Sequence, residues 1–115
     1  MDVVIWHNPR CSKSRETLAL LEARGIAPVV RKYLEDAPSA AEITAAAEAA
    51  GLSLRDMARR KEAEWKAQGL DDVDGPALAE AMSATPKLIE RPVVFANGRA
   101  ALGRPPEAVL ALLEG

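Results

Sequence analysis

The stretch VVIWHNPRCSKSRETLALLEARG, residues 3–25, decides how this chain begins to fold. The β-branched and aromatic residues 3–6 predict a short buried strand, which Asn8-Pro9 ends in a turn. Beyond Cys11, apolar residues recur at the spacing of one helix face, and Gly25 stands where a helix usually ends. The single cysteine of the chain therefore lies between a strand and the start of a helix.

The residues that follow predict a second strand and then a helical layer. Residues 29–34 form the strand, and because one helix joins it to the first, the two strands should be parallel with a right-handed crossover. Ser39 and Glu42 have capping-box spacing ahead of an alanine-rich helix that stops at Gly51. The run 53–56 repeats that signal, residues 62–68 continue helically, and Pro76 opens a further helix to residue 84.

The last third of the chain predicts a hairpin and a final helix. Residues 92–96 and 99–102 flank Asn97-Gly98, the strongest short-range hairpin signal, so these strands should be antiparallel. Residues 103–107 then open a helix that can pack on the sheet. The sequence predicts one α/β domain over residues 1–115, with a four-stranded mixed sheet and a helical insertion at about 38–85. Thioredoxin-like domains share this outline.

Composition sets limits on the function. The length of 115 residues and 49% hydrophobic content suit one core. The formal net charge of -2 gives no general attraction to nucleic acid or to an anionic membrane. The amino-terminal apolar run is too short for a signal peptide, and no run is long enough to span a membrane. We therefore expect a cytoplasmic protein in which thiols stay reduced.

Cys11 is the candidate nucleophile. A single cysteine is most often a small buried apolar residue, but here turn and cap residues surround it, which favours a surface cleft. At a helix start, backbone N–H groups, the helix dipole and nearby cations all stabilise a thiolate. The same groups, with the charges of Arg10, Lys13 and Arg15, would hold an oxyanion beside the sulfur.

Other candidate residues are weighed in the same way. His7 either orients the loop or pairs with the thiolate, and one Cys with one His cannot form the usual zinc set, so no metal is expected. Arg91-Pro92 begins the third strand, where thioredoxin-like domains place a proline facing the active cysteine. Arg59 and Arg104 stand at element ends, and guanidinium groups bind tetrahedral oxyanions in bidentate fashion. The alternative for each arginine is a solvated surface charge, and it is strongest for Arg59.

Four motifs in order carry a family resemblance: HNPRCSKSRETL, LRDMARRKE, LIERPVVFANG and LGRPPEAVL. Together they resemble the glutathione- and glutaredoxin-coupled arsenate reductases, over nearly the whole chain. The resemblance implies that Cys11 attacks arsenate, and that Arg59, Arg91 and Arg104 bind the oxyanion and the arsenic-bearing intermediate. His7 and Ser14 match residues thought to tune the thiolate. Glutathione would act as co-substrate, glutaredoxin would resolve the mixed disulfide, and no bound cofactor is required.

Two alternatives remain open at this stage. Redox-sensitive regulators that contact RNA polymerase share the fold, although they typically carry Cys-x-x-Cys where this chain has Ser14. A general glutathione-dependent monothiol oxidoreductase would keep Cys11 but needs no oxyanion-binding arginines. The role of Arg10, directly before the nucleophile, is undetermined by the sequence.

Overall fold

The computed structural model describes residues 2–114. Contacts between residues divide the chain into two compact units, Met1–Asp36 with Arg91–Gly115, and Ala37–Glu90. The predicted insertion at about 38–85 falls inside the second unit. The extent of a single folding domain stays a prediction.

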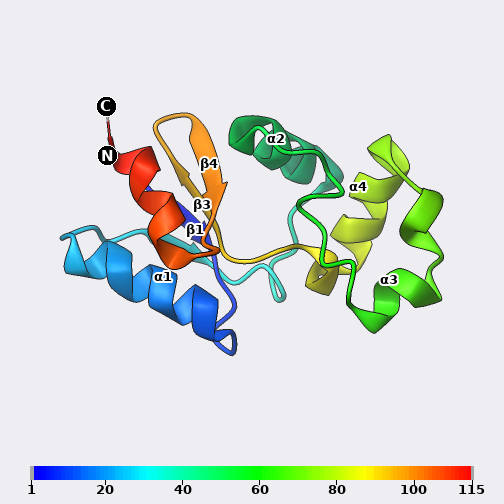
Figure 1. Ribbon diagram of the computed structural model, residues 1–115, viewed down its shortest axis with the longest axis horizontal. Helices are drawn as coiled ribbons and strands as arrows, with labels where there is room; N and C mark the ends of the chain where they lie inside the picture. The colour runs from blue at the N-terminus through cyan, green and yellow to red at the C-terminus, as the bar shows by residue number, and fades with distance from the viewer. Residues whose placement is uncertain (1, 115) are drawn as a thin grey trace. The chain divides into compact units, whose positions relative to one another are not determined.

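The first unit is built on a four-stranded mixed sheet (Figure 1). Its strands are β1 (Val4–Trp6), β2 (Val29–Arg31), β3 (Val93–Ala96) and β4 (Arg99–Leu102), in the order β2-β1-β3-β4. β1 pairs parallel with β2 and antiparallel with β3, and β3 pairs antiparallel with β4. The predicted fold class and the strand directions are confirmed.

Two helices pack against this sheet. Helix α1 spans Ser12–Ala23, and the 3₁₀ helix η3 spans Pro106–Leu113. Ile5, Val94 and Ala96 point to one side of the sheet and join Leu21, Val109 and other apolar residues in one buried cluster. On the strands, alternate side chains face opposite sides, so Trp6 and Phe95 pack on the other face with ring centroids 4.9 Å apart.

The predicted hairpin between β3 and β4 is present. Asn97 and Gly98 both have positive φ, 55° and 73°, as a two-residue turn of this kind requires. Gly103 follows β4 at a point of close approach, where an added Cβ would collide with the side chains of Thr17 and Pro92. Its amide donates to the Pro92 carbonyl at 3.0 Å, so β4 ends close against the start of β3 and against α1.

The second unit is helical. It holds α2 (Ala40–Ala50), α3 (Ala63–Ala67), η1 (Leu70–Asp72), α4 (Gly75–Ala84) and η2 (Pro86–Leu88), and α2 packs on α4. The predicted capping box is formed, with the Ser39 hydroxyl accepting from the Glu42 amide at 3.1 Å and the Glu42 carboxylate accepting from the Ser39 amide at 2.9 Å. Gly51 ends α2 with φ of 67°, as predicted.

Three sequence predictions differ from the structure. The helix predicted from residues 53–56 is absent from the described chain, where a hydrogen-bonded turn stands instead. Residues 57–59 then pair with residues 88–90 through an isolated bridge at Ala58 and Ile89, and this extended pairing prevents a helix from continuing. The second strand stops at Arg31 rather than at residue 34.

The final helix also differs, because it is 3₁₀ rather than α. Pro106, Val109 and Leu112 are its buried residues, and their spacing of three matches the three residues per turn of a 3₁₀ helix. Proline at 105 and 106 also removes two backbone donors from its start. Side chains of the hairpin bind its last carbonyls, since Asn97 Nδ2 donates to the Leu112 oxygen at 2.9 Å.

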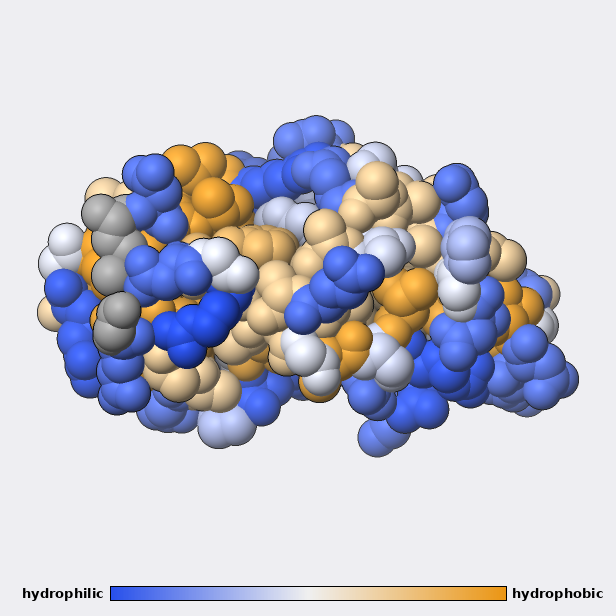
Figure 2. Space-filling view, turned by 90° about the horizontal axis from the view of Figure 1, so that it is seen from above, coloured by the Kyte–Doolittle hydropathy of each residue, from blue (hydrophilic) through white to orange (hydrophobic). Residues whose placement is uncertain are grey.

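Surface hydrophobicity is limited and local. Among residues 2–114, the exposed large hydrophobic residues are Val29, Val30 and Leu34, at 66%, 41% and 45%. The face drawn in Figure 2 shows hydrophilic side chains interspersed with separate hydrophobic areas. Among the described residues, no helix combines the length and the apolar character needed to cross a membrane.

Candidate active site

Cys11 is the N-cap residue of α1. Its backbone is extended, with φ of -95° and ψ of 124°, and its carbonyl accepts the first helical bond from the Arg15 amide at 3.0 Å. Its side chain is partly exposed and makes no capping hydrogen bond within residues 2–114. The first turn carries no acidic residue. The first backbone N–H groups of α1 therefore have no capping side chain from Cys11, and they lie at the positive end of the helix dipole.

The loop before Cys11 is held by its own hydrogen bonds. The Asn8 side chain accepts from the Arg10 amide at 3.0 Å, and the Asn8 carbonyl accepts from the Cys11 amide at 3.0 Å. The Arg15 guanidinium donates to the Pro9 carbonyl at 3.0 Å. Arg15 thus holds the loop backbone two residues before Cys11.

His7 and Ser14 form the buried base of this loop. His7 Nδ1 lies 2.7 Å from Ser14 Oγ, which also accepts from the Asn8 amide at 3.0 Å. Burial lowers the pKa of His7 below its usual 6.5, and the charges of Lys32 and Arg15 lower it further. A neutral imidazole is therefore favoured at neutral pH. Of the two roles considered for His7, the hydrogen bonding supports orientation of the loop.

Strand register places the Cys11 loop and two predicted arginines at one edge of the sheet. Trp6 pairs with Val93, and Val93 pairs with Leu102. The chain leaves β1 toward Cys11 at the same edge where residues 91–92 enter β3 and residues 103–104 leave β4. Neighbouring strands lie about 4.8 Å apart, so these three segments are adjacent. Trp6 also pairs with Arg31, which brings the end of β2 to this edge on the opposite side of β1.

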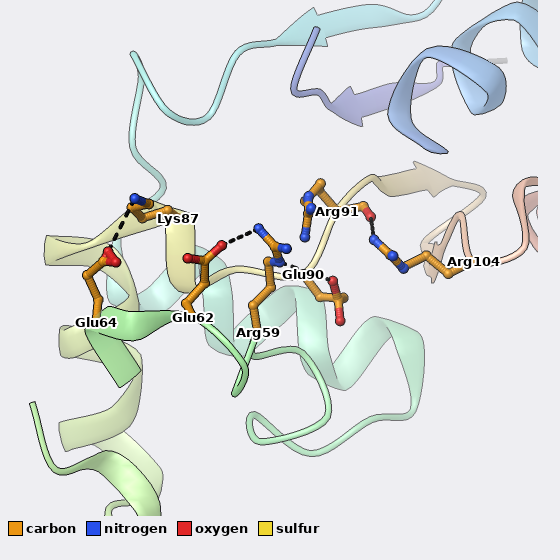
Figure 3. A network of polar contacts seen from close by, with 7 residues as sticks. All are labelled: Arg59, Glu62, Glu64, Lys87, Glu90, Arg91 and Arg104. Carbon is orange, nitrogen blue, oxygen red and sulfur yellow. Dashed lines mark hydrogen bonds and ion pairs between the residues drawn. The ribbon is translucent and has the colours of Figure 1, made fainter. Parts of the chain in front are cut away.

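Arg91 and Arg104 are directly linked. Arg104 Nη1 donates to the Arg91 carbonyl at 3.1 Å (Figure 3). The Arg91-Pro92 and Arg104-Pro105 peptide bonds are both cis. The structure thus brings together two of the three predicted oxyanion-binding residues, at the sheet edge that carries Cys11.

Arg59 belongs to the second unit, in which it is held by carboxylates. Its Nη1 is hydrogen-bonded to Glu62 Oε1, and its Nε lies 3.8 Å from Glu90 Oε1. Figure 3 shows this arrangement, with a second ion pair between Lys87 and Glu64. The Arg59 side chain is 29% exposed, so it is not the fully solvated surface charge considered as its alternative. Participation of Arg59 in oxyanion binding stays a prediction.

Sequence reasoning missed three residues that shape this site. Thr17 is fully buried, and its hydroxyl donates to the Lys13 carbonyl at 2.8 Å. Gly103 packs its backbone against Thr17, and Lys32 acts electrostatically on His7. The positions of Gly103 and Lys32 depend on strand register, whereas the Thr17 bond lies within α1. Only the glycine before Arg104 gave a sequence signal. Within the described residues, no three His, Cys, Asp or Glu side chains are grouped as a metal site.

This arrangement suits one kind of chemistry. A partly exposed sulfur at a helix amino terminus can act as a nucleophile, and adjacent guanidinium groups can hold an oxyanion against it.

Comparison with known proteins gives a consistent result. The family model described as ArsC family matches residues 6–112. The chain is 46% identical to an arsenate reductase of Haemophilus influenzae, covering 98% of this chain and 100% of the relative. It is 49% identical to an arsenate reductase of Neisseria meningitidis, over 97% and 98% of the two chains. A solved structure, an arsenate reductase from Vibrio cholerae, is 54% identical with a TM-score of 0.94, over 97% of this chain and 98% of that one.

Proposed function

The chain belongs to the ArsC family, and from this premise we propose that it is an enzyme that reduces arsenate to arsenite. Relatives close to half identical carry the arsenate reductase name over essentially their full length. The observation that carries the proposal is the common sheet edge of the Cys11 loop, Arg91 and Arg104, set by strand register and by the bond from Arg104 to the Arg91 carbonyl.

The first step is displacement at arsenic. The Cys11 thiolate attacks As(V) and a sulfur–arsenic bond forms, while one arsenate hydroxyl group takes up a proton and leaves as water as its arsenic–oxygen bond breaks. Arsenic stays As(V) in this adduct. Arg91 and Arg104 neutralise the oxyanion, with Arg59 as a further predicted ligand. Backbone N–H groups at the start of α1 stabilise both the entering anion and the thiolate.

The second step transfers electrons. A glutathione thiolate attacks the Cys11 sulfur, a disulfide bond forms, and the sulfur–arsenic bond breaks with its electron pair kept by arsenic. Arsenic is thereby reduced to As(III) and leaves as arsenite after taking up protons. Glutaredoxin then attacks the glutathione sulfur of the mixed disulfide and releases Cys11 as a thiolate. Two thiols are oxidised for each arsenate, so one cysteine on this chain is sufficient.

Glutathione is thus a co-substrate, and glutaredoxin is a partner. No prosthetic group or metal enters these steps. Both reductants belong to a reducing compartment, so we place the reaction in the cytoplasm.

The proposal is tested by measuring arsenite release. The purified chain is incubated with arsenate, glutathione and glutaredoxin, beside the Cys11→Ser variant and beside reactions that omit each reductant. The proposal predicts arsenite only with Cys11 and both thiol components. Equal arsenite release by the Cys11→Ser variant would contradict the nucleophilic role of Cys11. Full turnover without glutaredoxin would contradict the proposed coupling to glutaredoxin.

A further inference from the structure

A cavity lies beside the nucleophile loop on the side of β2. It has a volume of about 240 Å³ and is lined by residues 7–10 and by Lys32, Leu34 and Glu35. All of these residues belong to the first unit. Because β1 lies between β2 and β3, this cavity and the Arg91 and Arg104 pair flank the Cys11 loop from opposite sides.

Charged groups stand on both walls of the cavity. Arg10 comes from the loop, one residue before Cys11, while Lys32 and Glu35 come from the segment after β2. Within residues 2–114, the side chains of Arg10 and Lys32 take part in no ion pair or hydrogen bond. Two cations and one carboxylate therefore face a shared space beside the nucleophile.

This set of charges matches an amino-acid end group. Arg10 and Lys32 supply donors for a carboxylate, and Glu35 supplies an acceptor for an ammonium group. The exposed Leu34 side chain offers a wall for methylene groups. At 240 Å³ the cavity is smaller than the roughly 300–1,000 Å³ of sites that enclose a drug-sized ligand, so it suits one end of a small peptide.

The geometry of sulfur displacement supports the same placement. A thiolate that attacks the Cys11 sulfur must approach opposite to the arsenic atom that leaves it. With arsenic held on the side of β3 and β4 by Arg91 and Arg104, the entering thiol comes from the side of β2. The cavity lies on that side of the loop.

We propose that the cavity formed by Arg10, Lys32, Leu34 and Glu35 binds the amino-acid end of the small thiol that reduces the Cys11 adduct, in the class of γ-glutamyl peptides such as glutathione. This inference rests on the proposed function for its biological setting. It assigns Arg10 and Lys32 as specificity residues for the second substrate rather than for the oxyanion.

The test uses a reaction that needs no arsenate. The full chain is mixed with oxidised glutathione, and formation of the mixed disulfide on Cys11 is followed by intact-protein mass spectrometry. In this exchange the Cys11 thiolate attacks one glutathione sulfur, and the other glutathione leaves as a thiolate. Bis(2-hydroxyethyl) disulfide, which is uncharged, reports the reactivity of the sulfur itself.

The expected result is a selective loss of rate. Arg10→Gln and Lys32→Gln each slow the reaction with oxidised glutathione by about 5- to 10-fold at low ionic strength, consistent with loss of one charge-assisted hydrogen bond. Both variants react with bis(2-hydroxyethyl) disulfide within about 2-fold of the unaltered chain. Glu35→Gln lowers the rate of reaction with oxidised glutathione. It raises the rate with 3,3′-dithiodipropionate, which has carboxylates and no ammonium group.

Arg24→Gln is the matched control, because it removes one exposed cation of the same unit that does not line the cavity. A similar loss of rate in this control, or equal losses with charged and uncharged disulfides, would overturn the assignment. The assignment would also be overturned if the Arg10 and Lys32 variants lost rate only in exchange with glutaredoxin. If selectivity holds while arsenite release fails, the proposed function is wrong and the cavity remains a small-thiol site.

Discussion

The amino termini of α1 and α2 differ in whether side chains cap their first backbone N–H groups. Ser39 caps α2 with its own hydroxyl, and Glu42 completes the box, so side chains of the chain satisfy two backbone donors there. At α1 the N-cap is Cys11, whose side chain makes no capping bond in the described residues, and the first turn has no acid. One helix end is closed by its own residues, and the other is open to a ligand.

The capped start of α2 contributes to stability, whereas the start of α1 belongs to the candidate active site. An N-cap serine or aspartate typically contributes about 1 kcal/mol to helix stability. The cysteine forgoes much of that contribution and leaves the first N–H groups of α1 uncapped by its side chain, as the proposed binding of an oxyanion there requires.

Replacing Cys11 by Ser should abolish arsenate reduction while making the protein more stable. A serine hydroxyl is neither ionised nor comparably nucleophilic at neutral pH, so we expect a loss of at least about 10³-fold. Because serine is a good N-cap, the free energy of unfolding in urea should rise by about 0.5–1 kcal/mol. A less stable variant would show that the helix end is not open as described.

Removing Arg91 or Arg104 should weaken the reaction with arsenate and leave thiol exchange intact. Loss of one group that stabilises an oxyanion typically costs about 10²–10³-fold in rate. We expect Arg91→Ala and Arg104→Ala to fall in that range for arsenite release, with Arg91→Lys intermediate because lysine lacks the bidentate fork. Both alanine variants should still exchange with oxidised glutathione. Full arsenate activity in both would instead favour a general monothiol oxidoreductase.

Gly103→Ala should destabilise the open helix end. An added Cβ would collide with Thr17 in α1 and with Pro92, and overpacking of this kind costs about 1–3 kcal/mol. Urea unfolding measures the loss. Gly51→Ala provides a contrast without a clash, since nothing lies within 4 Å of its added Cβ although its φ is +67°. Gly103 itself has no positive φ, so a Gly103→Ala variant as stable as the unaltered chain would contradict the collision.

Ser39→Ala should affect the closed helix end only. Loss of the cap should lower the free energy of unfolding by about 1 kcal/mol, while the rate of arsenite release per folded molecule stays within about 2-fold. Ser39→Asp should recover most of the stability. A large loss of turnover at full folding would contradict the separation of roles between the two helix ends.

The pH dependence of stability should carry a small contribution from His7. Its pKa is lowered in the folded chain, mainly by burial, so below pH 6.5 the unfolded chain takes up a proton before the folded one does. The contribution of neutral, buried His7 to the free energy of unfolding is fully present above pH 6.5. It is lost as the pH falls toward the lowered pKa of the folded chain. Urea unfolding at pH 7.5 and 5.5 should show a smaller pH difference for His7→Gln than for the unaltered chain.

Local signals made much of this structure predictable. The capping box at Ser39, the Asn97-Gly98 turn and the strand–turn–helix around Cys11 each depend on residues close in sequence, and each is present. The helix expected after Ser53 failed because residues 57–59 pair instead with residues 88–90, a partner about thirty positions away. A local sequence pattern does not indicate pairing with a segment so distant in sequence.

The site residues also differ in whether a local motif or strand register determines their positions. Cys11, His7 and Ser14 could be grouped from one short motif, and the structure joins His7 to Ser14 by a hydrogen bond. The tuning of Cys11 by these two residues stays a prediction. The pairing of Arg91 with Arg104 depends on strand register and gave only a weak signal from element ends. Lys32 gave none, because its place beside the loop follows from the order of β2 and β1 in the sheet.

Protection of Cys11 by an oxyanion tests the central claim most directly. The rate of Cys11 alkylation by iodoacetamide is measured against arsenate concentration, without added thiol, for the unaltered chain and for the Arg91→Ala, Arg104→Ala double variant. The open helix end and its arginines predict saturable protection in the first and little or none in the second. Alkylation that is insensitive to arsenate in the unaltered chain would contradict the account.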